Sequence, residues 1–344
     1  MRFGLIGYGL WGRHHARAIA RAPGAELAGI ACRTQQSAEA ARRDFPGVPV
    51  YLDYRELLDR SSIDAVDVVV PNDLHAEIGV AALERGKDVL LEKPLAPTLP
   101  ECDRLIDAAR RSGRVLTIGH ELRLSAQWGR IKTLVDAGDI GEPTRAVVNL
   151  FRFPYRPGAE GWRYQPGRVG SWVLEELVHH VDVLMWYFER WGDPIAVYAV
   201  GAAGSRAPGL AESFSAVLRF PEPLHAVLTQ TVAGFEYHLA VELVGTEGAI
   251  RTWWSGAIDR TRSPALELKV KRRGQSEAET LPLAPSGELF ELEEELNQTV
   301  RAFGARRPLV SALEARKRIV VCLEAERSAR ERREVVLRWP GPQA

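Results

Sequence analysis

Short apolar runs alternate with helical patterns through the first third of the chain. The helical stretches lie near residues 11–21, 37–44, 75–85 and 100–111, and the apolar runs between them are FGLIGYG, ELAGIA, AVDVVV, DVLLE and VLTIG. Runs of Val, Ile and Leu separated by helices are typical of a parallel sheet covered on both faces. The pattern therefore predicts an α/β fold that begins with a doubly wound domain, whose ligands bind beyond the carboxyl ends of its strands.

A second pattern begins at residue 195, where strand-like runs dominate. These runs are IAVYAV, SFSAVLRF, HAVLTQTV, HLAVELVG and AIRTWW, and helical stretches near 288–304 and 311–332 follow them. Apolar and polar residues alternate in several of the runs, which fits a sheet with one buried face. The other face, which we expect to carry Trp253 and Trp254, is a candidate surface for oligomer formation.

Composition and charge exclude several classes of function. The 344 residues suffice for two domains, and the 45 acidic and 45 basic residues balance, so no net field favours nucleic acid or an anionic membrane. The apolar runs are too short to span a bilayer. The first strand begins at Phe3, so we expect no cleaved signal sequence and a cytoplasmic protein. The widely spaced Cys32, Cys102 and Cys322 are interpreted as reduced thiols, without a disulfide framework or a zinc site.

The segment GYGLWG places Gly7, Gly9 and Gly12 between the first strand and the first helix. Glycines there permit a tight turn and close backbone approach to a pyrophosphate, while the helix amino end offers N–H donors and a positive dipole. The spacing alone is a weak signal, but its place on the first strand of an α/β series predicts a dinucleotide site. The alternative is a glycine turn with a purely structural role.

The end of the second strand bears on the choice between NAD and NADP. A carboxylate there would bind the ribose 2′-hydroxyl of NAD, but this strand runs into Cys32, Arg33 and Thr34. Arg33 can stack on adenine or pair with a 2′-phosphate, and Thr34 can donate a hydrogen bond. The sequence therefore favours NADP, with NAD as the alternative. The structural alternative is that Arg33 is an ordinary solvated residue.

A second group of ionisable residues lies on a predicted helix at residues 171–188. At about 100° per residue, Glu175, His179 and Asp182 form one narrow stripe on an otherwise apolar helix. Buried ionisable groups must be paired or used, because leaving them unpaired is costly. His180 points about 100° away from His179 and cannot share its task. A Glu–His pair that only holds the helix is the structural alternative, and the spacing does not fit a helical zinc motif.

The segment before this helix, residues 151–172, is rich in Arg, aromatic residues, Pro and Gly. Aromatic rings stack on sugar faces, and arginine forks bind hydroxyl pairs or carboxylates. The segment is thus a candidate loop over a polar ring, with an ordinary surface loop or dimer arm as the alternative. Its candidate substrate contacts are Arg152, Tyr155, Arg156, Trp162, Arg163 and Tyr164.

Several motifs occur in a specific order along the chain. GYGLWG is followed by PNDLH (71–75), EKP (92–94), GHELR (119–123), DAGDIGEP (136–143) and the closing EAERSARERREV. With this set the chain resembles, over nearly its whole length, the Gfo/Idh/MocA oxidoreductase family, which includes glucose–fructose oxidoreductase and the inositol dehydrogenases. The resemblance implies a Rossmann domain at residues 1–120. It also implies a substrate-binding and oligomerisation domain at residues 121–344, of α+β type with a large, mostly antiparallel sheet.

The resemblance further implies NAD(P)-dependent hydride transfer between nicotinamide and a secondary hydroxyl or ketone of a sugar, cyclitol or glycoside. Lys93 matches the family lysine that reaches the reacting hydroxyl, where an ammonium stabilises a developing alkoxide. His179 matches the general acid/base, and Glu175, where the family more often has Asp, matches an orienting residue or substrate ligand. Arg123 and Asp182 join the expected substrate contacts. The expected cofactor contacts are Gly7, Gly9, Leu10, Trp11, Gly12, Arg33, Thr34, Pro71, Asn72, His75, Glu92 and Lys93.

Two other functions remain open at this point. One is an NADPH-dependent ketone or aldehyde reductase, and the other is a non-catalytic NADP-binding sensor or scaffold. The set Lys93, Glu175 and His179 favours an enzyme. The expected partners are a small polyhydroxylated substrate and further copies of the chain, as a homodimer or homotetramer formed through the C-terminal sheet.

Overall fold

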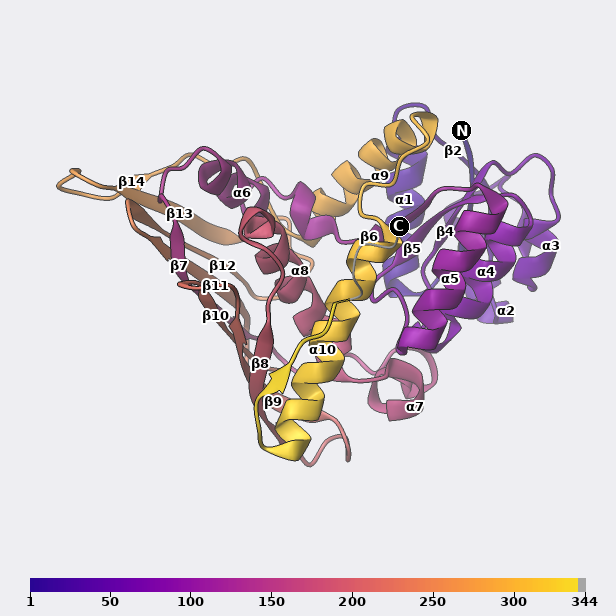
Figure 1. The fold of residues 1–344 in the computed structure, drawn as a ribbon. Coiled ribbons are helices and arrows are strands. Elements are labelled where there is room, and N and C mark those ends of the chain that lie inside the picture. Colours follow the sequence, from indigo (N-terminus) through magenta and orange to yellow (C-terminus); the bar gives the residue numbers. More distant parts are fainter. Residues whose placement is uncertain (340–344) are drawn as a thin grey trace. The chain divides into compact units, whose positions relative to one another are not determined.

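The computed structural model describes residues 1–339, which form two compact units. Figure 1 shows the course of the chain through both units. The first unit comprises Met1–His120, Pro157–Gly170 and Leu292–Ile319. The second unit comprises Glu121–Arg156, Ser171–Glu291 and the described residues from Val320 onward. Two segments from beyond residue 120 therefore belong with the first unit.

The first unit contains a six-stranded parallel sheet in the order β3-β2-β1-β4-β5-β6. From β1 the chain moves outward first through β2 and β3, and then in the other direction through β4, β5 and β6. This reversal beside β1 defines a doubly wound sheet and confirms the prediction. The strands are Arg2–Ile6 (β1), Glu26–Ala31 (β2), Val50–Tyr51 (β3), Ala65–Val68 (β4), Asp88–Glu92 (β5) and Leu116–Gly119 (β6).

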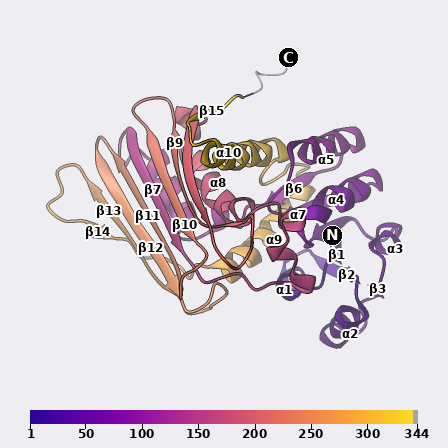
Figure 2. The same ribbon diagram turned by 90° about the horizontal axis from the view of Figure 1, so that it is seen from below.

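Five α-helices and one 3₁₀ helix connect these strands, close to the predicted stretches. They are Leu10–Arg21 (α1), Gln35–Asp44 (α2), Tyr54–Leu58 (α3), Asn72–Leu74 (η1), His75–Glu84 (α4) and Leu99–Ser112 (α5). The side chains of Thr34, Asp53 and Thr98 accept backbone N–H groups at the amino ends of α2, α3 and α5, which fixes where these helices begin. Helices α4 and α5 lie side by side (Figures 1 and 2). The pattern does not predict β3 and α3, which are too short to show a periodicity.

A hydrophobic cluster fills one side of the parallel sheet. Its fully buried members include Leu5 from β1, Ile19 from α1 and Ile30 from β2. Helix α9 (Glu288–Gly304) contributes Phe303, whose ring stacks on Phe3 with 6.2 Å between the ring centroids. The last part of α9 therefore helps to cover the sheet that carries the glycine motif.

The second unit contains a nine-stranded sheet in the order β14-β13-β12-β11-β7-β10-β9-β8-β15. In the described part of the chain, β7 and β10 form its single parallel pair, and the other pairs are antiparallel. A large, mostly antiparallel sheet is thereby confirmed. Its strands are Pro143–Phe151 (β7), Ala196–Ala203 (β8), Ala211–Arg219 (β9), His225–Thr231 (β10), Tyr237–Gly245 (β11), Gly248–Gly256 (β12), Ala265–Arg272 (β13), Glu279–Thr280 (β14) and Val335–Val336 (β15).

One face of this sheet is buried. Along β11, Leu239, Val241 and Leu243 are buried, whereas Ala240 and Glu242 between them are partly exposed, as expected for a half-buried strand. Figure 1 shows α6 and α8 on the same side of the sheet.

The remaining helices are Glu121–Leu124 (η2), Trp128–Asp136 (α6), Ala159–Tyr164 (η3), Pro166–Val169 (α7), Val173–Leu177 (a π-helix), Val178–Tyr187 (α8), Glu189–Trp191 (η5) and Ala312–Glu331 (α10).

The two tryptophans of β12 lie on opposite faces. Trp254 is only 3% exposed and its indole N–H donates to the carbonyl oxygen of Ser286 (3.0 Å). Trp253 is partly exposed, and its ring stacks on His238 from β11. The prediction that both face the open side is wrong for Trp254, because successive residues of a strand point in opposite directions.

The three cysteines are unbridged and buried, as predicted. Burial raises the pKa of Cys32 to about 11 and that of Cys102 to about 12, so these thiols stay protonated at neutral pH. Within residues 1–339, no helix combines the length and the apolar character that crossing a membrane requires.

Candidate active site

Three glycines form a cradle at the carboxyl end of β1. Gly7 has a φ of +104°, and a Cβ atom on it would lie 2.0 Å from the carbonyl oxygen of Val69. A Cβ atom on Gly12 would lie 2.1 Å from the carbonyl oxygen of Gly7, so the turn itself requires both glycines. A Cβ atom on Gly9, at the amino end of α1, would meet no atom of residues 1–339 within 4 Å. This open space beside the helix N–H groups fits the pyrophosphate of a dinucleotide.

Arg33 and Thr34 follow β2, and both interact with other protein groups. The Thr34 hydroxyl oxygen caps α2 by accepting the N–H of Ser37 (3.2 Å). Arg33 is exposed and forms an ion pair with the carboxylate of Glu160. An acidic group therefore does lie near the end of β2, although it comes from a distant part of the sequence. No local sequence pattern signals this pair.

The turn after β4 carries the predicted Pro71, Asn72 and His75. The Asn72 side-chain amide donates to the carbonyl oxygen of Val169 (3.0 Å). His75 is fully buried, and its Nδ1 atom lies 2.7 Å from the carbonyl oxygen of Pro94. These contacts join the turns after β4 and β5 and attach the segment Pro157–Gly170 to them. The other ring nitrogen of His75 lies 3.1 Å from the carbonyl oxygen of Val70, and its contact with the cofactor stays a prediction.

A buried cluster of charged residues lies next to the cradle. His15, from α1, places Nδ1 2.8 Å from an oxygen of Asp67 in β4 and Nε2 3.1 Å from an oxygen of Glu92 in β5. The same Glu92 oxygen accepts the indole N–H of Trp11 (2.6 Å), while Leu10 beside it is exposed. His15 and Asp67 are not among the residues predicted from the sequence. The available signal is an ionisable residue within each of the apolar runs AVDVVV and DVLLE.

These residues shift one another's pKa values. Burial acts to lower the pKa of His15, but Asp67 and Glu92 outweigh it and raise that pKa to about 10. Burial raises the pKa of Asp67, against the pull of His15. Burial also acts to raise the pKa of Glu92, yet His15, Lys93 and Trp11 together lower it to about 2. At neutral pH, a cationic His15 therefore stands between two buried acids.

Lys93 follows Glu92 directly at the end of β5. Its backbone N–H donates to the second carboxylate oxygen of Glu92 (3.1 Å), and the Lys93–Pro94 peptide bond is cis. Because His15 and Trp11 hold the first oxygen of Glu92, the Lys93 backbone is fixed at the carboxyl edge of the sheet. Only β4 separates β5 from β1 and the cradle. The structure thus places Lys93 at the ligand-binding edge that the sequence predicts.

The predicted helix at residues 171–188 is confirmed, but it begins with a π-helix. Residues Val173–Leu177 form this π-helix, and α8 continues from Val178. Because a π-helix bonds residue i to i+5, the angle between Glu175 and His179 differs from that of a regular α-helix. The position of Glu175 in the single stripe expected from α-helical spacing therefore stays a prediction. π-Helices of one turn are frequent at functional sites.

His179 and Asp182 contact different residues of the 3₁₀ helix η2. The Nδ1 atom of buried His179 lies 3.9 Å from a carboxylate oxygen of Glu121. Arg123 binds Asp182 in a bidentate ion pair, with N–O distances of 2.8 and 2.6 Å. Arg123 and Asp182, both predicted substrate contacts, thus fix η2 on α8. Glu121 is a neighbour of His179 that the sequence analysis misses, although it lies in the motif GHELR.

Arg152 and Tyr155 belong to a buried polar network centred on Glu176. The Glu176 carboxylate pairs with Arg152 and accepts hydrogen bonds from the hydroxyls of Tyr155 (3.1 Å) and Tyr237 (3.2 Å). Arg152 also lies 3.5 Å from Asp259. Burial raises the pKa of both tyrosines well above the ordinary value. Both hydroxyls therefore stay protonated at neutral pH and act as hydrogen-bond donors. Both side chains are buried, which does not fit the alternative of an ordinary surface loop; their contact with substrate stays a prediction.

The other aromatic and basic residues of this region divide between the units. Arg156 is exposed at the end of a second-unit segment, whereas Trp162, Arg163 and Tyr164 lie in Pro157–Gly170 of the first unit. The Arg163 guanidinium lies over the Trp162 ring, 4.5 Å from its centroid. The predicted loop at residues 151–172 is therefore divided between the two units at residues 156 and 157.

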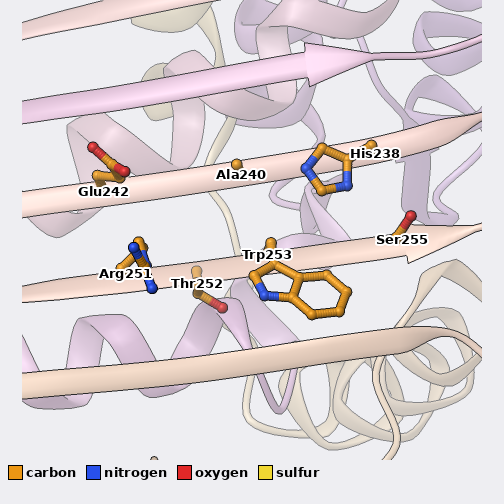
Figure 3. A pocket seen from close by; sticks show the side chains of 7 residues that line it. All are labelled: His238, Ala240, Glu242, Arg251, Thr252, Trp253 and Ser255. Atoms are coloured by element: carbon orange, nitrogen blue, oxygen red, sulfur yellow. The ribbon is translucent and has the colours of Figure 1, made fainter. Parts of the chain in front are cut away.

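An open hollow of about 400 Å³ lies on the exposed face of the second sheet, across β11 and β12 (Figure 3). Within it, Glu242 lies opposite Arg251 on the neighbouring strand, and Trp253 stacks on His238. None of the predicted catalytic or cofactor residues lines it. The lining residues are His238, Ala240, Glu242, Arg251, Thr252, Trp253 and Ser255.

Comparisons with known proteins agree with the fold and the glycine cradle. Residues 1–120 match a family model described as an oxidoreductase family with an NAD-binding Rossmann fold, and residues 128–251 match the GFO/IDH/MocA C-terminal domain. The fold and site thus define an oxidoreductase with a nicotinamide dinucleotide site. The chain belongs to the GFO/IDH/MocA family.

Several similar proteins have names that contain a sugar derivative or a cyclitol. A 1,5-anhydro-D-fructose reductase from Ensifer adhaerens is 32% identical over 295 residues, which cover 83% of this chain and 84% of that enzyme. Inositol 2-dehydrogenase from Salmonella typhimurium is 28% identical over 201 residues, 58% of this chain and 57% of that enzyme. The structure of levoglucosan dehydrogenase in complex with NADH and levoglucosan covers 100% of both chains, with a TM-score of 0.85 and 23% identity. The structural likeness supports the fold.

Proposed function

We propose that this enzyme transfers hydride between a nicotinamide and a secondary hydroxyl, or the corresponding ketone, of a sugar, cyclitol or glycoside. The bound cofactor supplies the hydride acceptor or donor at nicotinamide C4. Lys93 stabilises the developing alkoxide and lowers the pKa of the reacting hydroxyl. His179 takes the hydroxyl proton during oxidation and returns it during reduction.

The observation that carries this proposal is the place of Lys93 at the carboxyl edge of the parallel sheet. Glu92 holds the Lys93 backbone, and His15 and Trp11 hold Glu92. An ammonium group in a pre-organised position needs little rearrangement when charge develops on a substrate oxygen. The glycine cradle on β1 lies at the same edge, two positions away in the sheet, which supports a shared role for cradle and lysine.

The surroundings of His179 support its role as acid and base. Its imidazole is buried, with the Glu121 carboxylate 3.9 Å from Nδ1. A carboxylate at this distance favours the imidazolium that forms when His179 accepts a proton. Glu175, on the adjoining π-helix, is the candidate to orient the imidazole or to bind a substrate hydroxyl.

The named relatives support a polyhydroxylated ring as the substrate. An anhydroketose, a cyclitol and an anhydrosugar are the substrates that their names contain. In this chain, the partly exposed Arg163 guanidinium lies over the buried Trp162 ring, and its N–H groups are the candidate donors to ring hydroxyls.

The end of β2 supports NADP as the preferred cofactor. This strand ends without a carboxylate of its own, and Arg33 offers a guanidinium that can pair with a 2′-phosphate. NAD remains the alternative cofactor, because Glu160 lies beside Arg33.

The reductive direction is the second candidate for the physiological reaction. The relative with 32% identity is named as a reductase of 1,5-anhydro-D-fructose. The same residues serve both directions, since Lys93 stabilises the alkoxide that forms when a ketone accepts hydride.

A substrate panel tests the proposal. Sugars, cyclitols and anhydrosugars are offered with NAD and NADP, and the matching ketones with NADH and NADPH, while nicotinamide absorbance is recorded. We expect turnover with at least one ring-bearing substrate. Cofactor binding without turnover across the whole panel would instead support the non-catalytic sensor or scaffold.

We also propose that the exposed face of the second sheet forms a contact between copies of the chain, in a homodimer or homotetramer. This face presents Trp253, whose ring stacks on His238. It also presents Glu242 and Arg251, which lie opposite each other on neighbouring strands. Aromatic and arginine side chains are enriched at such contacts.

A further inference from the structure

Four charged side chains form a continuous chain of ion pairs in the first unit. One oxygen of Glu160 pairs with Arg33, and the other lies 3.2 Å from Arg168. Arg168 in turn lies 3.2 Å from Asp73. Glu160 and Arg168 both come from the segment Pro157–Gly170, which the chain supplies long after the parallel sheet is complete.

The two ends of this chain stand on either side of the glycine cradle. Arg33 follows β2 and Asp73 follows β4, and these two strands flank β1 in the sheet. The segment Pro157–Gly170 therefore passes across the carboxyl edge at which the cradle lies. The hydrogen bond from the Asn72 amide to the Val169 carbonyl oxygen (3.0 Å) anchors its far end.

Glu160 is held in place by its own backbone. Its φ of 58° is in the left-handed region, and Gly158 and Gly161 on either side also have positive φ. The side-chain amide of Gln165 donates to the Glu160 carbonyl oxygen (2.7 Å). The hydrogen bond from Arg33 holds the pKa of the Glu160 carboxyl below its ordinary value. At neutral pH, the Glu160 carboxylate is therefore ionised and paired with the Arg33 guanidinium, the group that would bind a 2′-phosphate.

We propose that Glu160 is a specificity-determining residue for the cofactor, which competes with the 2′-phosphate of NADP for Arg33 and so narrows the preference for NADP over NAD. This inference rests on the proposed recognition of the 2′-phosphate by Arg33. To bind NADP, Arg33 must exchange one anion for another, and the displaced carboxylate remains near a phosphate group that carries a charge of about −2. NAD has no 2′-phosphate, so its ribose neither requires this exchange nor meets this repulsion.

The expected change in NADP affinity follows from the exposure of the Arg33 and Glu160 side chains. Both side chains are more than half exposed, at 58% for Arg33 and 54% for Glu160, and the pairing of exposed ions changes an equilibrium by at most about fivefold. Repulsion between carboxylate and phosphate adds to this in the same direction. We therefore expect Glu160→Gln to raise the affinity for NADP by about three- to tenfold and to change the affinity for NAD by less than about twofold.

The test is calorimetric titration of NADP and NAD into wild type, Arg33→Ala, Glu160→Gln and the double variant. Glu84→Gln is the matched control, because Glu84 forms a comparable exposed pair with Arg111. It stands at the carboxyl end of α4, which leads into the amino end of β5, so it lies at the opposite edge of the sheet. Glu160→Asn, with a residue that tolerates positive φ, checks that the backbone is not the cause. Thermal melting of each variant reports folding.

The expected result is a gain in NADP affinity in Glu160→Gln and Glu160→Asn, absent from Glu84→Gln and smaller in the Arg33→Ala background, where only the repulsion between carboxylate and phosphate is left to relieve. The gain should shrink at 0.5 M salt, where exposed charges are screened. If Arg33→Ala weakens NADP binding but the Glu160 variants bind NADP like wild type, the inference about Glu160 is overturned and the cofactor proposal stands. If Arg33→Ala leaves NADP affinity unchanged, both are overturned.

Discussion

At the scale of single residues, the ligand-binding edge of the parallel sheet depends on one buried cation between two carboxylates. His15 bridges Asp67 and Glu92, and Glu92 in turn accepts the backbone N–H of Lys93. Removing the cation would leave two buried acids without their main partner, which typically costs about 3–5 kcal/mol. The proposed catalytic lysine therefore relies on a histidine that need not touch substrate.

We predict that His15→Ala lowers the free energy of unfolding by about 3 kcal/mol at pH 6.5. The pKa of His15 is raised in the folded protein to about 10. Its stabilisation is therefore fully present below about pH 6.5, the ordinary histidine pKa, and is lost as the pH rises through about 10. Urea unfolding from pH 6.5 to 10 should show stability falling more steeply in wild type than in His15→Ala. Parallel pH profiles would show that His15 is not cationic in the folded state.

The contacts within this cluster could not be predicted from the sequence. His15, Asp67 and Glu92 come from three separate elements, and only the register of α1 on β4 and β5 brings them together. The ion pair between Arg33 and Glu160 likewise joins two residues that are far apart in the sequence and meet only in the fold. Lys93, by contrast, is predictable in place, because it directly follows a recognisable buried strand.

At the scale of elements, the turn after β1 itself requires Gly7 and Gly12 but not Gly9. A Cβ atom on Gly12 would collide with the carbonyl oxygen of Gly7, whereas a Cβ atom on Gly9 would meet only open space in the described structure. Gly9 also has an extended backbone, with φ −80° and ψ −165°, that alanine adopts without strain.

We predict that Gly9→Ala folds with unchanged or slightly higher stability but binds the cofactor at least tenfold more weakly. The added methyl group would occupy the space in which the pyrophosphate approaches the amino end of α1. Gly12→Ala should instead lower the free energy of unfolding by about 1–3 kcal/mol. Thermal melting and cofactor titration separate the two effects. Wild-type cofactor affinity in Gly9→Ala would mean that the dinucleotide does not lie on this cradle.

Regular elements are predictable here because their periodicities are local. Strands β1, β2, β4, β5 and β6 and helices α1, α2, α4 and α5 follow the patterns of the sequence within a few residues. The π-helix Val173–Leu177 does not, because its residues would suit a regular α-helix equally well and only its tertiary contacts select the wider turn. Trp254 faces the buried side because it directly follows Trp253 in the strand, and successive side chains of a strand point to opposite faces.

At the scale of the whole molecule, the exposed face of the second sheet is the proposed contact between copies of the chain. We predict that Trp253→Ser shifts the protein toward the monomer in light-scattering measurements at micromolar concentration, because it removes the aromatic ring at the centre of the hollow. Leu52→Ser is the control, since Leu52 is a 50% exposed apolar residue of the first unit. An unchanged mass for Trp253→Ser, or equal shifts in both variants, would place the contact elsewhere.

We propose that Lys93 and His179 perform the chemistry and that most of the affinity for the cofactor comes from other groups. The most direct test measures turnover and cofactor affinity in Lys93→Ala and His179→Ala, beside Lys271→Ala and His225→Ala as controls on exposed positions. We predict that kcat falls by about 10²–10⁴-fold in the first two variants, while their melting temperatures and cofactor Kd values stay close to wild type and both controls keep full turnover. Near-normal kcat in Lys93→Ala and His179→Ala, with the substrate that the wild type turns over, would contradict the account.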